Sequence, residues 1–206
     1  DPFEARRLIR QVLEGLSSLH SLSDPIIHHE LTNQNVMLDL SGTEAASVII
    51  DFGQARRKSE VGWRPLPGHD PYYLAPECLT DESGPAADVF AACALYYHML
   101  FGIPPWYLNI SQYQAQHSDI HAALEKERRS KLKYPQMQSG LSVDEREMKA
   151  LECALSLSPS TRFSSASEFV EALSKGPGAI SISASHLSAD RGGQVNRSSR
   201  KIKRGF

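Results

Sequence analysis

Polar side chains that could carry chemistry are concentrated in two short stretches of the first quarter of the chain. The run PIIHHELTNQN brings together His28, His29, Glu30 and Asn35, and the run SVIIDFG places Asp51 directly after apolar residues. Polar residues grouped in a loop contribute little to burial, so they are more often functional than those in a helix. The amide of Asn35 and the carboxylate of Asp51 offer the oxygen ligands that Mg²⁺ prefers beside nucleotide phosphates.

Two strands and several helices are expected to hold these residues in place. The runs NVMLDL and SVIID, joined by the turn SGTEA, are typical of two short strands. The run AADVFAACALYYHMLFG is apolar nearly all round and ends on Gly102, which predicts a buried helix. Because the other periodic segments are helical, a doubly wound sheet is excluded and the fold is predicted to be mainly α. Helices are expected at about residues 2–21, opened by Asp1 and Pro2, at 86–102, 112–129 and 143–156, and at 164–174, opened by Ser164.

The composition is that of an ordinary globular protein. The chain has 206 residues, of which 41% are hydrophobic, and it contains no run of 18 apolar residues. No signal peptide or membrane span is therefore predicted, although a start at Asp1 without Met indicates a fragment with more chain upstream. The three cysteines are far apart and odd in number. We expect reduced, buried thiols and a cytoplasmic location.

Charge divides the chain into two parts. Residues 175–206 contain seven Lys or Arg and one Asp, so this segment is +6; since the whole chain is −2, residues 1–174 are −8. A basic segment rich in Ser and Gly that lacks apolar periodicity is expected to be a linker or a disordered tail. Its last ten residues, RSSRKIKRGF, could contact nucleic acid or an acidic partner, but a solvated linker is the favoured interpretation, so nucleic-acid binding is not expected.

The order of five motifs resembles the C-terminal lobe of a eukaryotic-type serine/threonine protein kinase, over nearly all of residues 1–174. The catalytic loop of that family runs His-Arg-Asp-Leu with an Asn five positions after the Asp, and here His28-His29-Glu30-Leu31 is followed by Asn35. The metal-binding Asp-Phe-Gly motif is matched by Asp51-Phe52-Gly53 and the Ala-Pro-Glu motif by residues 75–77. The resemblance implies a helical bundle with a small β-hairpin that carries the catalytic and metal-binding loops.

The resemblance also implies roles for individual residues. Glu30 would accept the proton of the substrate hydroxyl, Asn35 and Asp51 would hold Mg²⁺ and ATP, and Met37 would form the floor of the adenine pocket. Three further positions would be structural: His28 would support Phe52, Asp88 would hold the catalytic-loop backbone, and Glu77 would form a buried ion pair with Arg162. The implied cofactors are ATP and Mg²⁺, and the implied partners are a protein substrate or regulated protein and an N-terminal lobe upstream, with no membrane.

Departures from the family pattern leave two functions open. Glu30 replaces the catalytic Asp, His29 replaces the Arg that commonly receives an activation-loop phosphate, and Thr32 replaces a lysine that faces the transferred phosphoryl group. His69 or Asp70 stands where the substrate-facing loop usually has Thr, and no glycine-rich loop or strand lysine is present. The intact protein is therefore either a slow kinase for Ser or Thr, or a pseudokinase that binds nucleotide or partners without phosphotransfer.

Overall fold

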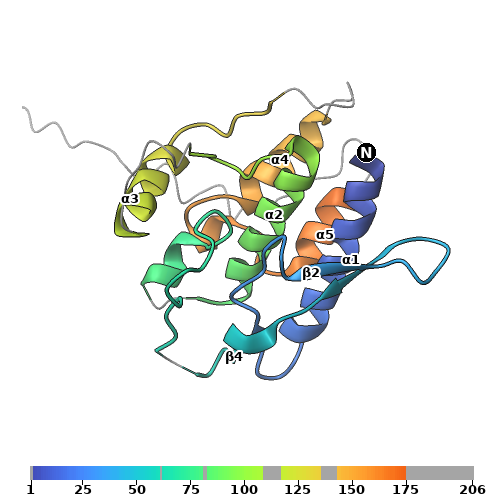
Figure 1. Cartoon of the computed structure of the whole chain (residues 1–206), viewed down its shortest axis with the longest axis horizontal. Helices are drawn as coiled ribbons and strands as arrows, with labels where there is room; N and C mark the ends of the chain where they lie inside the picture. The colour runs from blue at the N-terminus through green and yellow to red at the C-terminus, as the bar shows by residue number, and fades with distance from the viewer. Residues whose placement is uncertain (1, 61, 81–82, 109–116, 136–142, 175–206) are drawn as a thin grey trace, which may run out of the picture.

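The computed structural model describes most of the chain as a helical body with two small sheets (Figure 1). The described residues are all except 1, 61, 81–82, 109–116, 136–142 and 175–206. The expected helix start at Asp1, the first part of the helix expected at 112–129, and the basic tail therefore lie outside the described residues.

The order of elements confirms the mainly α prediction. Five helices are described, α1 (Pro2–His20), α2 (Pro85–Phe101), α3 (His117–Arg128), α4 (Glu145–Ala154) and α5 (Ala166–Ser174). The strands are β1 (Ile26–Ile27), β2 (Val36–Asp39), β3 (Ala46–Ile49) and β4 (Arg56–Arg57). Short 3-10 turns cover Phe52–Gln54, Pro76–Leu79 and Pro159–Thr161. The helix bounds agree with those expected from the sequence within a few residues wherever the chain is described.

Helix α2 lies at the centre of the body, with α1, α4 and α5 around it (Figure 1). Its residues are buried on nearly every side, as its apolar sequence predicts. Gly102 ends the helix with a φ of 75° and donates its N–H to the carbonyl of His98 at 2.8 Å. An L-residue with a β-carbon rarely adopts this left-handed conformation, so the glycine is needed at this position.

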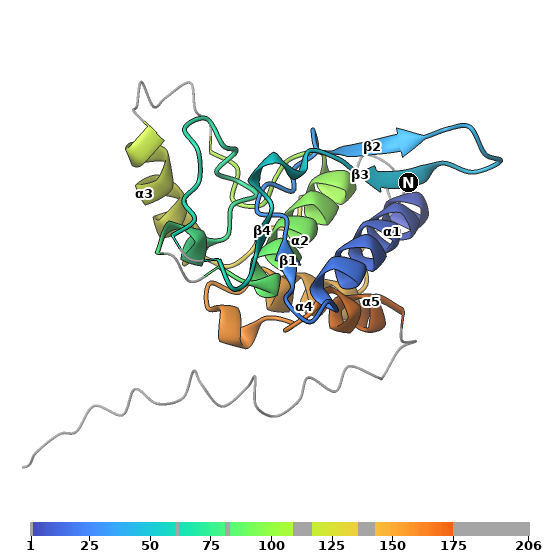
Figure 2. The ribbon, with the colours of Figure 1, turned by 90° about the horizontal axis from the view of Figure 1, so that it is seen from below.

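The predicted strand pair forms an antiparallel hairpin, β2–β3, in which Val36 pairs with Ile49. The hairpin is fastened to α1, because Ser47 N donates to Gln11 Oε1 at 2.7 Å and Ser47 Oγ donates to the carbonyl of Leu8 at 3.0 Å. Figure 2 shows it extending from the body above α1. A second sheet, β1–β4, was not predicted, since strands of two residues are too short to show a period in the sequence.

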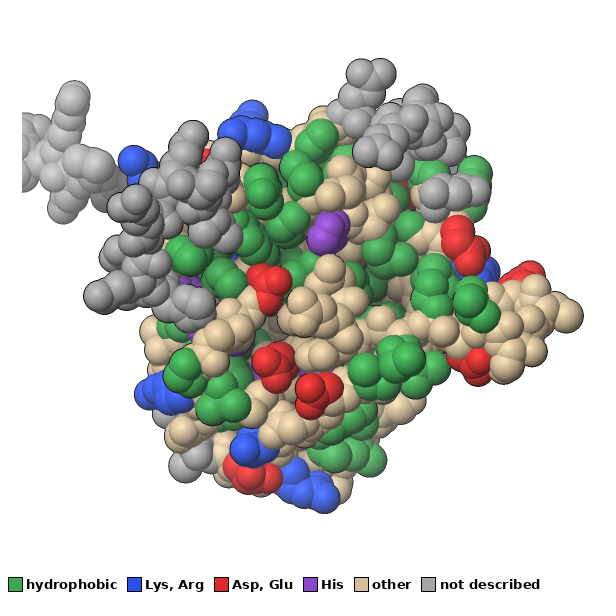
Figure 3. Space-filling view, viewed as in Figure 1, with side chains coloured by type: hydrophobic (Ala, Val, Ile, Leu, Met, Phe, Trp, Pro, Cys, Tyr) green, Lys and Arg blue, Asp and Glu red, His purple; other side chains and the backbone are tan. Residues whose placement is uncertain are grey.

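The outer part of the hairpin carries apolar side chains that the described residues leave uncovered. Met37, Leu38, Leu40 and Val48 are between 44% and 72% exposed. Figure 3 shows apolar side chains at the base of the hairpin, among others spread over this face of the molecule. Met37 and Val48 pair across the strands and share one face of the hairpin, whereas Leu38 points to the other face. Exposed apolar side chains that lie near one another are typical of a contact surface for another domain or a ligand. Within the described part of the chain, the helices lack the length and apolar character needed to cross a membrane.

Candidate active site

Asp88 of α2 holds the backbone of the loop from His28 to Asn35, which is called the catalytic loop here after its counterpart in the family. The carboxylate of Asp88 accepts the backbone N–H of His28 at 2.8 Å and that of His29 at 3.0 Å, and it is 1% exposed. Burial on its own would raise the pKa of Asp88, but the hydrogen bond and charge of His20 and the two backbone donors together lower it below its ordinary value. The predicted role of Asp88 is confirmed. Its contact with His20 Nε2, at 2.9 Å, was not predicted.

His28 connects the catalytic loop to the Asp-Phe-Gly segment. Its ring is fully buried, Nε2 donates to the carbonyl of Ile50 at 3.1 Å, and Nδ1 accepts the N–H of Glu30 at 3.3 Å. The edge of its ring meets Phe52, with ring centroids 4.9 Å apart and an interplanar angle of 66°. His28 therefore supports Phe52 as predicted, and it also fixes the backbone of Glu30.

Asn35 and Asp51 lie at the same end of the hairpin. The carbonyl of Asn35 accepts the N–H of Ile50 at 3.0 Å, which extends the β2–β3 pairing by one step and places Asp51 next to it. The Nδ2 of Asn35 donates to the backbone carbonyl of Glu30 at 2.7 Å, so the catalytic loop is tied to this end of the hairpin. Because the side-chain amide uses its nitrogen for this bond, its oxygen is the atom left to bind a cation.

Asp51 has a backbone conformation that points to a functional constraint. Its φ is 59° and its ψ is 73°, and its Oδ1 accepts the N–H of Gly53 at 3.2 Å. Among the described non-glycine residues, only His29, Asp51 and Trp106 have a positive φ. Two of these three belong to the loops just described, and strained residues of this kind tend to occur where a side chain must be aimed at a ligand. The Asp51 side chain is exposed.

The donor atoms at this end of the hairpin fit Mg²⁺ bound together with a nucleotide. Mg²⁺ is usually held by one or two protein oxygens, several waters and the phosphates of the substrate. The amide oxygen of Asn35 and the carboxylate of Asp51 are such a pair. Within the described residues there is no group of three or more His, Cys, Asp or Glu that could hold a metal on its own.

Glu30 and Met37 lie beside this pair on the same two elements. Glu30 is half-buried in the catalytic loop, with its backbone N–H bound to His28 and its carbonyl bound to Asn35. Met37 is the second residue of β2, pairs with Val48, and is 57% exposed. The four predicted residues thus lie on the loop from His28 to Asn35 and on the end of the hairpin that this loop adjoins, linked through the backbone of Glu30 and Asn35.

His29, the residue that replaces an arginine, packs against the loop after Asp51. Its ring stacks on Trp63 with centroids 4.1 Å apart and an interplanar angle of 10°, and its Nε2 is 2.7 Å from Ser83 Oγ. Burial lowers the pKa of His29 below its ordinary value of 6.5. The loop is therefore held by an aromatic stack rather than by a charged arginine. The role of Trp63 was not predicted, since nothing in the sequence around this tryptophan indicates a partner 34 residues earlier.

The loop is also anchored at Ser59. Its backbone N–H donates to Asp24 Oδ1 at 3.1 Å, and its hydroxyl donates to Asp24 Oδ2 at 2.6 Å. The β1–β4 pairing ends next to this contact, because Arg57 pairs with Ile26 and the following residue, Lys58, donates its N–H to the carbonyl of Pro25 at 2.7 Å. The segment after Asp51 is thus fixed to the body at two places without any modified side chain.

The predicted ion pair between Glu77 and Arg162 is confirmed. Arg162 Nη1 lies 2.5 Å from Glu77 Oε1 and Nη2 lies 2.8 Å from Oε2, and Arg162 is fully buried. The guanidinium also donates to the carbonyls of Ser156, Ala86 and Leu157 at 2.6, 3.2 and 3.1 Å. All five N–H groups of the arginine therefore have acceptors, which is the condition for a stable buried guanidinium.

A second buried arginine, Arg128 at the end of α3, was not predicted. Its Nη2 donates to the carbonyls of Pro71 at 2.9 Å and Leu74 at 3.0 Å, just before the Ala-Pro-Glu motif. Burial, with the charge of Arg162, lowers the pKa of Arg128 to about 10, so it is still a cation at neutral pH. In the sequence, Arg128 is one of several charged residues in the run EKERR, where nothing distinguishes it from a solvated side chain.

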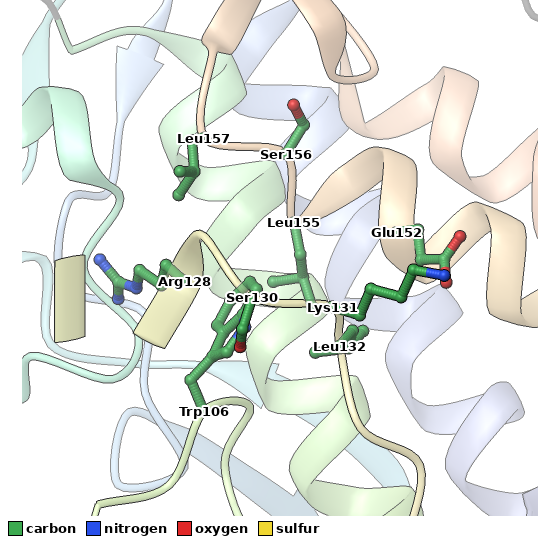
Figure 4. A pocket seen from close by; sticks show the side chains of 9 residues that line it. All are labelled: Trp106, Arg128, Ser130, Lys131, Leu132, Glu152, Leu155, Ser156 and Leu157. Atoms are coloured by element: carbon green, nitrogen blue, oxygen red, sulfur yellow. The ribbon is translucent and has the colours of Figure 1, made fainter. Parts of the chain in front are cut away.

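A pocket of about 340 Å³ lies next to Arg128, between the ends of α3 and α4 (Figure 4). Trp106, Leu132 and Leu155 form apolar parts of its wall. None of the residues predicted for the active site lines it. The guanidinium of Arg128 points away from the middle of the pocket in Figure 4, in agreement with its bonds to residues 71–74. The pocket is therefore separate from the candidate active site.

Comparison with known proteins agrees with the geometry. The family described as "Protein kinase domain" matches residues 1–173. The chain is 35% identical over 126 residues to serine/threonine-protein kinase 17A of Oryctolagus cuniculus, 33% identical over 105 residues to calcium-dependent protein kinase SK5 of Glycine max, and 35% identical over 107 residues to mitogen-activated protein kinase kinase kinase 3 of Homo sapiens. These matches cover 56%, 50% and 49% of the chain but only 31%, 20% and 16% of the relatives. Because the family match extends over most of its length, the chain belongs to the protein kinase family.

Proposed function

We propose that residues 1–174 are the C-terminal lobe of a protein kinase that transfers the γ-phosphate of ATP to Ser or Thr of a protein substrate. The observation that carries the proposal is the link between Glu30 and Asn35. The 2.7 Å bond from Asn35 Nδ2 to the Glu30 carbonyl joins a candidate base to the end of the hairpin, where Asp51 also lies. A base and two metal ligands in one rigid unit are what phosphoryl transfer needs from this side of the site.

The roles of the residues follow from this arrangement. The half-buried Glu30 orients the substrate hydroxyl and accepts its proton, while the oxygens of Asn35 and Asp51 hold a magnesium–nucleotide complex. Bound Mg²⁺ neutralises charge on the phosphates. Met37 contacts adenine from the exposed surface of β2. The other side of the nucleotide, and the lysine that pairs with its phosphates, are assigned to a second lobe, which would cover the exposed apolar side chains of the hairpin.

We assign the tail and the location as part of the same proposal. Residues 175–206 serve as a basic linker and have no catalytic role. A cytoplasmic protein is favoured, because the three cysteines have free thiols and because ATP is the proposed cofactor.

Catalysis at this site is expected to be slow. The side chain of glutamate is one carbon–carbon bond longer than that of the aspartate in the family. The carboxylate of Glu30 therefore lies farther from the backbone, toward the substrate. A displacement of about 1 Å can reduce the rate on the order of a hundredfold when catalysis depends on positioning.

A pseudokinase is the second candidate, and the stack of His29 on Trp63 favours it. In this arrangement the loop after Asp51 is fixed without a phosphate, and the position that commonly binds that phosphate is filled by a half-buried histidine. A domain held permanently in one conformation is suited to bind a nucleotide or a partner and to regulate it without phosphotransfer.

Phosphotransfer by the full-length protein to a Ser/Thr peptide distinguishes the two candidates. A slow kinase predicts that Glu30→Ala lowers turnover by a further factor of roughly a hundred, and that Glu30→Asp retains or raises it. Glu44→Ala, which removes a 74% exposed carboxylate on the hairpin turn, is the matched control and should leave turnover unchanged. Turnover that is unaffected by Glu30→Ala would rule out Glu30 as the base, and no turnover in the wild type would favour the pseudokinase.

A further inference from the structure

Two histidines from distant parts of the chain meet on the surface near the substrate-facing loop. His69 lies in the loop before the Ala-Pro-Glu motif and His121 lies on α3. Their Nε2 atoms are 3.0 Å apart, and their rings are nearly parallel, with centroids separated by 5.0 Å. Both residues are half-buried, so solvent reaches the pair. The candidate active site uses neither of them.

A backbone contact determines the tautomer of His69, so that the nitrogen facing His121 is the hydrogen-bond acceptor. Its Nδ1 donates to the carbonyl of Leu66 at 2.8 Å, so the lone pair of the neutral ring is on Nε2. Gly68, with a φ of 93°, makes the turn that brings His69 back over this carbonyl. A histidine whose second nitrogen donates to a backbone carbonyl is the usual arrangement around a metal ligand, because that bond fixes the tautomer and raises the basicity of the other nitrogen.

The separation of the two nitrogens matches that of two ligands on one metal ion. Nitrogens that each lie about 2.1 Å from an ion are about 3.0 Å apart when the angle at the metal is near 90°. An angle near 90° is typical of Ni²⁺ and Cu²⁺ with imidazole ligands, whereas tetrahedral Zn²⁺ would require a slightly wider separation. We infer that His69 and His121 form a binding site for a late transition-metal ion, with water completing the coordination.

The site would join two elements that are not continuous in the sequence. In the absence of metal, one hydrogen bond connects the imidazoles, with His121 Nε2 as the donor. To bind a metal ion, His121 takes the other neutral tautomer, with its proton on Nδ1, so that the Nε2 of each imidazole gives a lone pair to the ion. The two coordinate bonds then fasten the loop around His69 to α3. Arg128 already fastens the following residues, 71–74, to the far end of the same helix. The inference does not depend on phosphotransfer, so it holds for a kinase and a pseudokinase alike.

Calorimetric titration of the 206-residue chain with Ni²⁺ tests the inference. The expected result is one site, with affinity reduced roughly tenfold or more by either His69→Asn or His121→Asn. His98→Gln is the matched control: it removes another half-buried imidazole, whose Nδ1 is 2.6 Å from Tyr73 OH, and it should leave Ni²⁺ affinity unchanged. Ni²⁺ should also raise the thermal unfolding midpoint of the wild type and of His98→Gln, but not that of the two site variants.

Several results would overturn the inference. Binding that is lost in His121→Asn but kept in His69→Asn would place the metal on α3 alone. Equal losses in His98→Gln, or the absence of Ni²⁺ binding by a wild-type chain that unfolds cooperatively, would contradict it as well. The thermal measurement shows in the same samples that each variant is folded.

Discussion

Replacing either partner of the buried ion pair, Glu77→Ala or Arg162→Ala, should lower the free energy of unfolding by about 3 kcal/mol. The magnitude follows from the contacts. Glu77→Ala removes two of the five hydrogen bonds of a fully buried guanidinium and leaves its charge without a counterion. Arg162→Ala leaves the carboxylate and three backbone carbonyls without donors, and it also empties the space beside Phe90, whose ring centroid is 4.8 Å from the guanidinium carbon. Of the two single variants, Arg162→Ala should therefore cost more.

Urea unfolding of the wild type, the two single variants and the double variant, followed by far-UV circular dichroism, measures the coupling. The double variant no longer buries an unpaired charge, so its cost should be smaller than the sum of the single costs by at least about 1 kcal/mol. The exposed pair Arg129–Glu125 has a similar separation of 2.7 Å with both side chains more than 60% exposed, and it is the control, for which no measurable coupling is expected. Additive costs at Glu77 and Arg162 would refute the reasoning.

Three further predictions concern the nucleotide and the loop after Asp51. The 206-residue chain alone should bind Mg-ATP weakly and transfer no phosphate, since under the proposed function it supplies only one side of the adenine site; micromolar affinity by calorimetry would contradict this. Ser59→Ala should leave the activity of the full-length protein unchanged, because the backbone bond to Asp24 and the stack on Trp63 still hold the loop; a large loss would identify Ser59 as a switch. The lowered pKa of His29 means that the unfolded chain binds more protons below the ordinary value of 6.5, so stability should fall as the pH decreases through and below that value. Urea midpoints at about pH 7.5 and about pH 5.5 should therefore differ less in His29→Asn than in the wild type; an equal difference would show that His29 is not the group responsible.

The motifs located the active-site loops because each motif specifies a chemical requirement that few residue types meet. Asn35 and Asp51 were selected as oxygen ligands at strand ends, and the structure places them at the same end of one hairpin. The pair of Glu77 and Arg162, 85 residues apart, was found only through the resemblance to the kinase family. Their roles in binding and catalysis are still predictions.

Contacts outside the motifs could not be predicted. His20 and Asp88 are 68 residues apart, and Arg128 reaches carbonyls 54 to 57 residues earlier. Hydrophobic periodicity reports which side of a helix is buried, but it does not report which distant polar group that side meets. The stack of His29 on Trp63 could not be predicted for the same reason, since it depends on the path of a loop whose sequence has no hydrophobic periodicity.

Mg²⁺-dependent binding of ATP by the full-length protein, compared between the wild type and Asp51→Asn, tests the central claim most directly. Asp51→Asn removes the charged oxygen ligand at the end of the hairpin and should weaken this binding at least roughly tenfold, which corresponds to about 1.4 kcal/mol. Asp39→Asn, at the far end of β2, changes an exposed carboxylate that accepts the N–H of Ser41 at 2.9 Å, and it should have no effect. Equal affinity in the wild type and Asp51→Asn would contradict the assignment of this loop as a kinase nucleotide site.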